Sequence, residues 1–240
     1  MKITDLYYKL GGKKNSFLQR KWSAYICKKN RKKQCVLLQK EGLSALMAMQ
    51  KACDEAHVCF GLEFGTMLGA YREHGFIKFD NDIDLTMIST DCTRDFENIL
   101  LKYGFYKKRA FYLETIDEKG RLTRKLTEIA LSYNGLQVDI FFAFPITDSL
   151  RSIFVYCQPS IGNKMTVKEF LLPYDTNEQH KVNIKGVYFN VFSEPQHTLS
   201  SIYGDDFMTP KKNANATNNK RSIVKIHNIR QSFGIGYILE

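Results

Sequence analysis

The sequence predicts an α+β fold in which helices flank a mixed or antiparallel sheet. Three observations lead to this fold class: helical periodicity early in the chain, strand-like runs in its middle, and two-residue turns between those runs. The chain has 240 residues, of which 44% are hydrophobic, 13% aromatic and 25% charged. That length and composition suffice for one domain with a sizeable, aromatic core.

The first half of the chain alternates between helical and strand-like patterns. In order, the pattern predicts a helix over 36–55, a short buried strand over 58–64, a helix from Thr66 to Gly75, a strand over 82–88 and a helix over 91–103. We expect Thr66 to cap its helix, because threonine is a favourable N-cap residue. Gly104 follows the last of these helices as its expected C-cap.

The second half is richer in strands. Strand-like runs cover 105–115, 125–133 and 136–142, and a second set covers 181–184 and 187–192. Asn134-Gly135 and Lys185-Gly186 separate neighbouring runs and predict two hairpins. The stretch between 143 and 180 is less regular. A short helix over 196–203 and a loop over 211–220 complete the prediction.

The net charge of +10 is concentrated near the N-terminus. Residues 1–40 carry twelve Lys and Arg and one acid, Asp5, so this segment is +11 while the rest is −1. We therefore divide the chain into a basic leader, 1–35, and a domain, 36–240. Basic residues mixed with Trp22 and Tyr25 suit an anionic membrane surface. We rank a solvated leader without a partner second and nucleic acid third, because the domain itself is not basic.

The cysteines and the apolar runs bear on location. Six cysteines occur without any C-x-x-C spacing, which argues against a zinc site and a disulfide framework. No signal-peptide pattern and no run of roughly 18–20 apolar residues is visible. We expect a reducing, cytoplasmic location, with peripheral contact at the inner membrane face.

Three acidic residues on two predicted strands form a candidate metal site. Asp82 and Asp84 are two residues apart in a strand, so they share a face. Asp139 lies between Val138 and Ile140 on another strand. Converging carboxylates repel one another unless cations neutralise them, and hard oxygen ligands suit Mg²⁺ or Mn²⁺ in phosphoryl transfer. For the D-x-D pair alone, a polar strand face or a turn is the alternative.

A phosphate site is predicted next to these carboxylates. Gly65 would allow a close backbone approach, and the amides that open the next helix, with the Thr66 hydroxyl, could bind a phosphate. Gly-Thr pairs are common by chance. The order, spacing and strand context of the whole set favour a metal site.

The same residues resemble a known family. Residues 65–84 read G-T-M-L-G-A-Y-R-E-H-G-F-I-K-F-D-N-D-I-D and resemble the LicD signature, G-T-L-L-G-A-x-R-x-x-G-F-I-P-W-D-D-D-I-D. Residues 199–210 resemble the family's L-x-x-x-Y-G-x-x-W-x-x-P element, and Asp139 stands where the family has its third carboxylate. The similarity covers roughly residues 40–210. The departures from the pattern, which bear on the donor head group, are Lys78, Phe79, Asn81 and Phe207.

The resemblance implies a nucleotidyltransferase fold of the polymerase-β type and a transferase activity. LicD proteins, like fukutin-like ribitol-phosphate transferases, move a phospho-substituent from a CDP-alcohol to a glycan. The implied reaction transfers phosphocholine from CDP-choline to lipopolysaccharide or capsule and releases CMP. The partners would be a CDP-alcohol donor and a glycan acceptor. The alternatives are transfer of NMP from an NTP to a small molecule or protein, and a non-catalytic nucleotide- or membrane-binding module.

Further residues of the similar segments receive expected roles. Arg72 is expected to bind a donor phosphate because of its place in the motif and its fork of donors. Its alternative is an ion pair with Glu73. Asp80 could orient the site or act as a base, or it could simply end a strand. Tyr203 is expected to pack, with glycan binding as its alternative.

Overall fold

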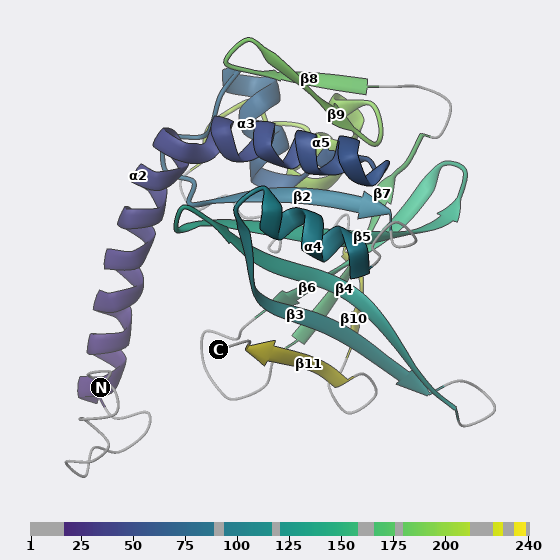
Figure 1. Ribbon diagram of the computed structural model, residues 1–240, viewed down its shortest axis with the longest axis horizontal. Coiled ribbons are helices and arrows are strands. Elements are labelled where there is room, and N and C mark those ends of the chain that lie inside the picture. Colours follow the sequence, from purple (N-terminus) through teal and green to yellow (C-terminus); the bar gives the residue numbers. More distant parts are fainter. Residues whose placement is uncertain are drawn as a thin grey trace.

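The described residues form a nine-stranded mixed sheet flanked by helices, together with a separate two-stranded sheet (Figure 1). The computed structural model describes residues 17–88, 94–116, 121–157, 166–175, 180–211, 223–227 and 233–238. In chain order its elements are α2 (Phe17–Ala56), β1 (Phe60–Leu62), α3 (Phe64–Glu73), β2 (Asp82–Ile88), α4 (Arg94–Lys102), β3 (Phe105–Ile116), β4 (Leu122–Tyr133), β5 (Leu136–Thr147), β6 (Leu150–Cys157), β7 (Thr166–Pro173), β8 (His180–Ile184), β9 (Val187–Val191), α5 (Pro195–Tyr203), β10 (Ile223–His227) and β11 (Phe233–Ile238).

The main sheet is organised around β5. Its strands run in the order β10-β7-β6-β5-β4-β3-β11, with β2 beside β5 and β1 beside β2. The first part of β5 lies between β2 and β4, and its end pairs with β6. Among the described strands only β2 and β5 pair in parallel. The predicted mixed sheet with flanking helices is therefore confirmed.

Both predicted hairpin turns are present. Asn134 and Gly135 join β4 to β5 with φ values of 49° and 84°, and Lys185 and Gly186 join β8 to β9 with 50° and 89°. Two-residue turns with positive φ at both positions match the twist of antiparallel strands. These turns could be predicted because their chemistry is local.

Helices cover one face of the central strands. α2 contacts α4, β2 and β5, and α4 contacts β3. From α2, Leu38, Leu46 and Met49 are fully buried in the core. Ile129 and Leu131 of β4 line a groove with Leu100 of α4, so this is the face that α4 covers. Alternation along β4 places its neighbouring side chains on the opposite face.

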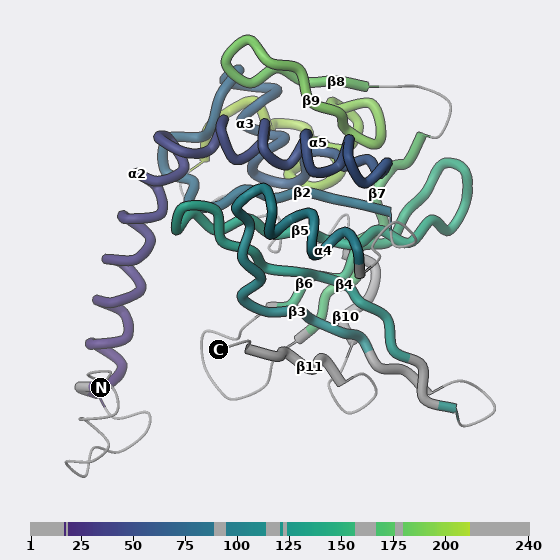
Figure 2. Tube along the Cα trace, viewed as in Figure 1, coloured from purple at the N-terminus to yellow at the C-terminus, as the bar shows by residue number. Residues whose placement is uncertain are grey.

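The helix predicted to begin at residue 36 begins at Phe17. Most of the predicted leader thus continues into the helix that packs on the sheet, and its N-terminal half extends away from the body (Figure 2). The reason is that residues 17–35 contain no proline or glycine to end a helix. No described helix, α2 included, combines the length and the apolar character needed to cross a bilayer. The division into 1–35 and 36–240 stays a prediction.

Two other expectations are corrected. The region that was expected to be less regular contains β6 and β7, which carry polar side chains such as the buried Arg151 and Ser152 and so lack a simple apolar pattern. α3 begins at Phe64, before the expected cap, and Glu63 is its N-cap residue without a side-chain capping bond. Beyond Lys211, the predicted loop lies outside the described residues.

Candidate functional site

The three predicted carboxylates meet at the junction of β2 and β5. Asp84 is the parallel partner of Asp139, and Asp82 lies two residues earlier on the same face of β2. One carboxylate oxygen from each residue lies within 4.8 Å of the others. Asp139 is buried, whereas the other two are partly exposed. The convergence that strand alternation predicted is present in the structure.

Burial and mutual repulsion disfavour the ionised form of this cluster. Burial, followed by the charges of Asp80 and Asp139, raises the pKa of Asp82 to about 8. Burial, followed by the charges of Asp82, Asp80 and Asp139, also raises the pKa of Asp84 well above its ordinary value. The pKa of Asp139 rises to about 6 through burial, against a hydrogen bond from Gln137. Near neutral pH the cluster needs protons or cations to offset its charge.

The residues present fit a hard divalent cation. Asp139 Oδ2 accepts a 2.6 Å hydrogen bond from Gln137 Nε2, while the buried Oδ1 has no hydrogen-bond partner among the described residues. A buried oxygen left without a partner is costly unless a ligand completes its contacts. Three converging carboxylates are the donor set that Mg²⁺ and Mn²⁺ prefer. The orphaned oxygen and the donor chemistry therefore agree with the predicted metal site.

Gly65 and Asp80 lie directly against each other. A Cβ atom at position 65 would come 2.5 Å from Asp80 Oδ2, so the absent side chain makes room for this carboxylate. The Gly65 amide donates to Asp84 Oδ2 over 3.3 Å. Asp80 itself precedes β2, and its Oδ1 accepts from the Asn81 amide at 3.0 Å. In the structure, the close approach that Gly65 permits is therefore made by Asp80. The phosphate role of Gly65 and the orienting or base role of Asp80 stay predictions.

Thr66 and Arg72 contact protein groups. The buried Thr66 Oγ1 accepts a 2.9 Å hydrogen bond from the Asp84 amide and so fastens α3 to β2. Arg72 forms the ion pair with Glu73 that was its alternative, at 2.7 Å, and donates to the Phe207 carbonyl at 3.3 Å. It also lies seven residues after Gly65, about 10 Å further along the helix. Their predicted phosphate roles stay predictions.

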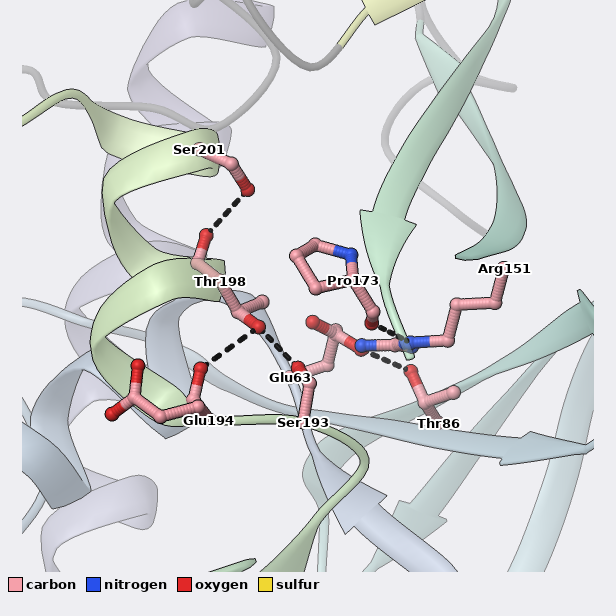
Figure 3. A network of polar contacts seen from close by, with 8 residues as sticks. All are labelled: Glu63, Thr86, Arg151, Pro173, Ser193, Glu194, Thr198 and Ser201. Atoms are coloured by element: carbon pink, nitrogen blue, oxygen red, sulfur yellow. Dashed lines mark hydrogen bonds and ion pairs between the residues drawn. The ribbon is translucent and has the colours of Figure 1, made fainter. Parts of the chain in front are cut away.

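Sequence reasoning missed a buried ion pair behind the site. Glu63 and Arg151 are 0% and 1% exposed, and Arg151 Nη1 lies 2.6 Å from Glu63 Oε2 (Figure 3). Thr86 Oγ1 of β2 donates to the same oxygen at 2.8 Å, and Arg151 Nε donates to the Pro173 carbonyl at 3.1 Å. The pair thus joins the end of β1 to β2, β6 and β7. Glu63, an acidic residue inside an apolar run, was the one feature of the sequence that could have indicated this pair. Its partner Arg151 is 88 residues away and could not be identified from the sequence.

Two further residues near the carboxylates were not predicted there. Tyr203 is partly buried and packs against the core as expected. Burial, followed by the charges of Asp84 and Asp80, raises the pKa of its hydroxyl well above the usual value, so the side chain lies near the site. Glu128 of β4 is buried, and burial followed by the Asp139 charge raises its pKa to about 8. The sequence feature that could have indicated Glu128 is its position as an acidic residue within a largely apolar part of a strand.

One departure from the motif has a visible contact. Where the signature has an aspartate, Asn81 Nδ2 donates a 3.1 Å hydrogen bond to Asp82 Oδ2. An ionised aspartate at this position could only accept a hydrogen bond. Asn81 therefore supports the carboxylate beside it.

Comparison with known families agrees with this geometry. The family model described as LicD/FKTN/FKRP, nucleotidyltransferase domain, matches residues 57–186, which include all three carboxylates. No curated protein gives a match to the chain. The matched segment also contains Glu63 and Arg151, so the buried ion pair belongs to the same unit.

Breaking the buried ion pair should destabilise the fold. We expect Arg151→Met to lower the free energy of unfolding by about 3–5 kcal/mol, because it leaves the Glu63 charge buried without a cation. A second change, Glu63→Met, should recover part of that loss. Lys102→Met, which breaks an exposed ion pair with Glu55, should cost less than about 1 kcal/mol. Urea unfolding of the four proteins measures this, and equal losses in Arg151→Met and Lys102→Met would contradict it.

Metal-free stability should fall as the pH rises. Between the ordinary carboxyl range and the raised folded-state pKa of Asp82, about 8, the folded protein binds more protons than the unfolded chain. Stability is therefore greatest at the acidic end of this range and is lost toward pH 8. Thermal unfolding in the presence of a chelator should show that the Tm falls as the pH rises. This pH dependence should be weaker in Asp82→Asn and unchanged in Asp54→Asn, which alters an exposed carboxylate. A pH dependence that Asp82→Asn leaves intact would refute the explanation.

Proposed function

Because the chain belongs to the LicD family, we propose that it is a metal-dependent transferase that moves a phospho-substituent onto a cell-surface glycan. The favoured reaction takes phosphocholine from CDP-choline to lipopolysaccharide or capsule. The acceptor hydroxyl attacks the phosphorus distal to the nucleoside, the bond from that phosphorus to the bridging oxygen breaks, and CMP leaves. The observation that carries this proposal is the junction of Asp82, Asp84 and Asp139 within the matched segment.

In this proposal the three carboxylates hold Mg²⁺ or Mn²⁺. The bound cation would neutralise charge on the phosphates during transfer. Gln137 and Asn81 orient the carboxylates of Asp139 and Asp82 through hydrogen bonds. We also propose the polymerase-β type of nucleotidyltransferase fold, on the support of the parallel β2–β5 pair and the helix that precedes it.

A second function remains within the same family description. The matched domain is named for nucleotidyltransferases, so transfer of NMP from an NTP is the alternative reaction. The two reactions differ in their products: CMP from a CDP-alcohol, or pyrophosphate from an NTP. A non-catalytic module is less well supported, because three clustered carboxylates are costly to keep without a cation.

We further propose that the N-terminal half of α2 lies on an anionic membrane surface, at the cytoplasmic face where lipid-linked acceptors would be presented. From Phe17 to Lys40 the helix has no acidic residue, and its basic side chains between residues 20 and 33 are exposed. Phe17, Trp22 and Tyr25 are 69%, 40% and 57% exposed among them. Lysines with exposed aromatics suit the charged and interfacial layers of a bilayer.

Vesicle binding tests the membrane contact. We expect the full chain to sediment with phosphatidylglycerol-containing vesicles but not with pure phosphatidylcholine. Replacing Lys28, Lys29, Lys32 and Lys33 by Gln should weaken binding roughly a hundredfold or more, since each lysine contributes about 1 kcal/mol near such a surface. The matched control replaces four exposed lysines of the body, Lys51, Lys125, Lys181 and Lys185. Equal losses in both variants, or binding to nucleic acid alone, would reject the contact.

Donor binding tests the reaction. With Mg²⁺ and a hundredfold excess over Kd, CDP-choline should raise the Tm by roughly 5–10 °C. The shift should vanish without metal and in Asp139→Asn, but persist in Asp54→Asn. CDP-ribitol, CTP and ATP are measured in parallel. A shift with CTP or ATP alone, with pyrophosphate release, would favour NMP transfer, and no shift with any nucleotide would count against both reactions.

A further inference from the structure

We propose that Arg109 of β3 is a phosphate-binding residue of this site and holds a phosphate of the donor beside the carboxylate cluster. The inference rests on the proposed function only for the identity of the phosphate compound. The anion site itself follows from strand register, from ring contacts and from two unpaired buried atoms.

Strand register places Arg109 in line with the carboxylates. Arg109 pairs with Ala130 of β4, Ala130 pairs with Asp139 of β5, and Asp139 pairs with Asp84 of β2. Paired residues on adjacent strands project from the same face, about 5 Å apart. Ala130, whose side chain ends at Cβ, thus stands between an arginine on one neighbouring strand and the carboxylate of Asp139 on the other.

A β-bulge puts Arg109 in this position. The pairing of β3 with β4 is regular through Lys107 and Leu131, and then shifts so that Arg109, not Lys108, stands opposite Ala130. Lys107 pairs with Glu97 of α4 and so lies on the helix-covered face. Bulges near active sites commonly redirect a side chain in this way.

Aromatic stacking holds the guanidinium in place. Arg109 Cζ lies 5.1 Å from the centre of the Phe111 ring, which stacks on Tyr156 at 4.5 Å. Tyr156 is fixed in turn by a 3.2 Å hydrogen bond between its hydroxyl and Thr127 Oγ1. A planar guanidinium held on a ring face keeps its N–H groups free at the edge for bidentate contacts.

Arg109 and Asp139, the two charged residues on either side of Ala130, each have an unused hydrogen-bonding atom. Arg109 Nε and Asp139 Oδ1 are buried and lack hydrogen-bond partners among the described residues. They are therefore not bonded to each other. A phosphate satisfies both residues at once, because some of its oxygens can contact a cation held by Asp139 while others accept from the guanidinium. Arg72 Nε also lacks a partner among the described residues, but the terminal nitrogens of Arg72 are already held by Glu73 and by the Phe207 carbonyl.

The competing explanation is that Arg109 is only a counterion. Its charge lowers the pKa of both Asp139 and Glu128 against the effect of burial. A counterion would affect the stability of the protein without ligand but would leave anion affinity unchanged. Anion affinity therefore separates the two explanations.

The test measures binding of inorganic pyrophosphate to the full chain by calorimetry in excess Mg²⁺. We expect Arg109→Ala to weaken binding roughly ten- to hundredfold, because a charge-assisted contact is lost. Arg109→Lys should fall in between, since it keeps the charge but not the fork. Lys108→Ala removes the same charge from the adjacent, exposed residue and should change affinity less than about twofold. Added guanidinium ion should restore binding to Arg109→Ala.

Several results would overturn the proposal. They are no pyrophosphate binding to the wild type, unchanged affinity in Arg109→Ala, or an equal loss in Lys108→Ala. Circular dichroism and ligand-free Tm values check the fold, and Arg109→Lys carries the test should Arg109→Ala not fold. Pyrophosphate binding that depends on Arg109, without binding of any CDP-alcohol, would retain the anion site and reject the proposed donor. Turnover of CDP-choline that is unaffected by Arg109→Ala would retain the proposed donor and reject the anion site at Arg109.

Discussion

The buried ion pair between Glu63 and Arg151 is the constraint on which the geometry of the site depends. It anchors the last residue before α3 to strands β2, β6 and β7, in a place that water does not reach. Immediately after it, Phe64 adopts a φ of 40°, an unusual conformation for a bulky residue. Tight packing of Phe64 against Phe141 and Phe170 holds that turn in place. The helix that starts there directs its Gly65 amide at a site carboxylate.

The two faces of the central strands differ in chemistry. The face under α2 and α4 is apolar, while the other carries the carboxylates, Glu128 and Arg109 beside aromatic side chains such as Phe111 and Phe141. Burying so many charged groups works against stability, and active sites commonly retain such a cost because the chemistry requires it. In this chain the apolar layer behind β2 and β5 offsets that cost, and the rigid strands keep the charged groups at fixed separations.

Local patterns predicted the parts of the molecule that local chemistry determines. Both hairpin turns, the strand β2 and the convergence of its acids with Asp139 follow from turn residues and alternation. The parts that depend on distant partners were not predictable. No residue near Glu63 in the sequence indicates that Arg151 is its partner. The helix-capping role expected of Thr66 was wrong, because the helix begins two residues earlier, at Phe64. Arg109 was missed because register, including a bulge, is a property of two strands together.

The bulge in β3 has a consequence for how chain length can vary. Between Tyr106 and Arg109 the strand carries one residue more than the partner strand needs. Removing a single residue there would turn the bulge into regular pairing and leave Arg109 opposite Ala130. In the regular parts of β3 the same one-residue loss would invert the facing of every side chain beyond it. Shortening β3 by one residue at this bulge therefore keeps Arg109 on the face that carries the carboxylates.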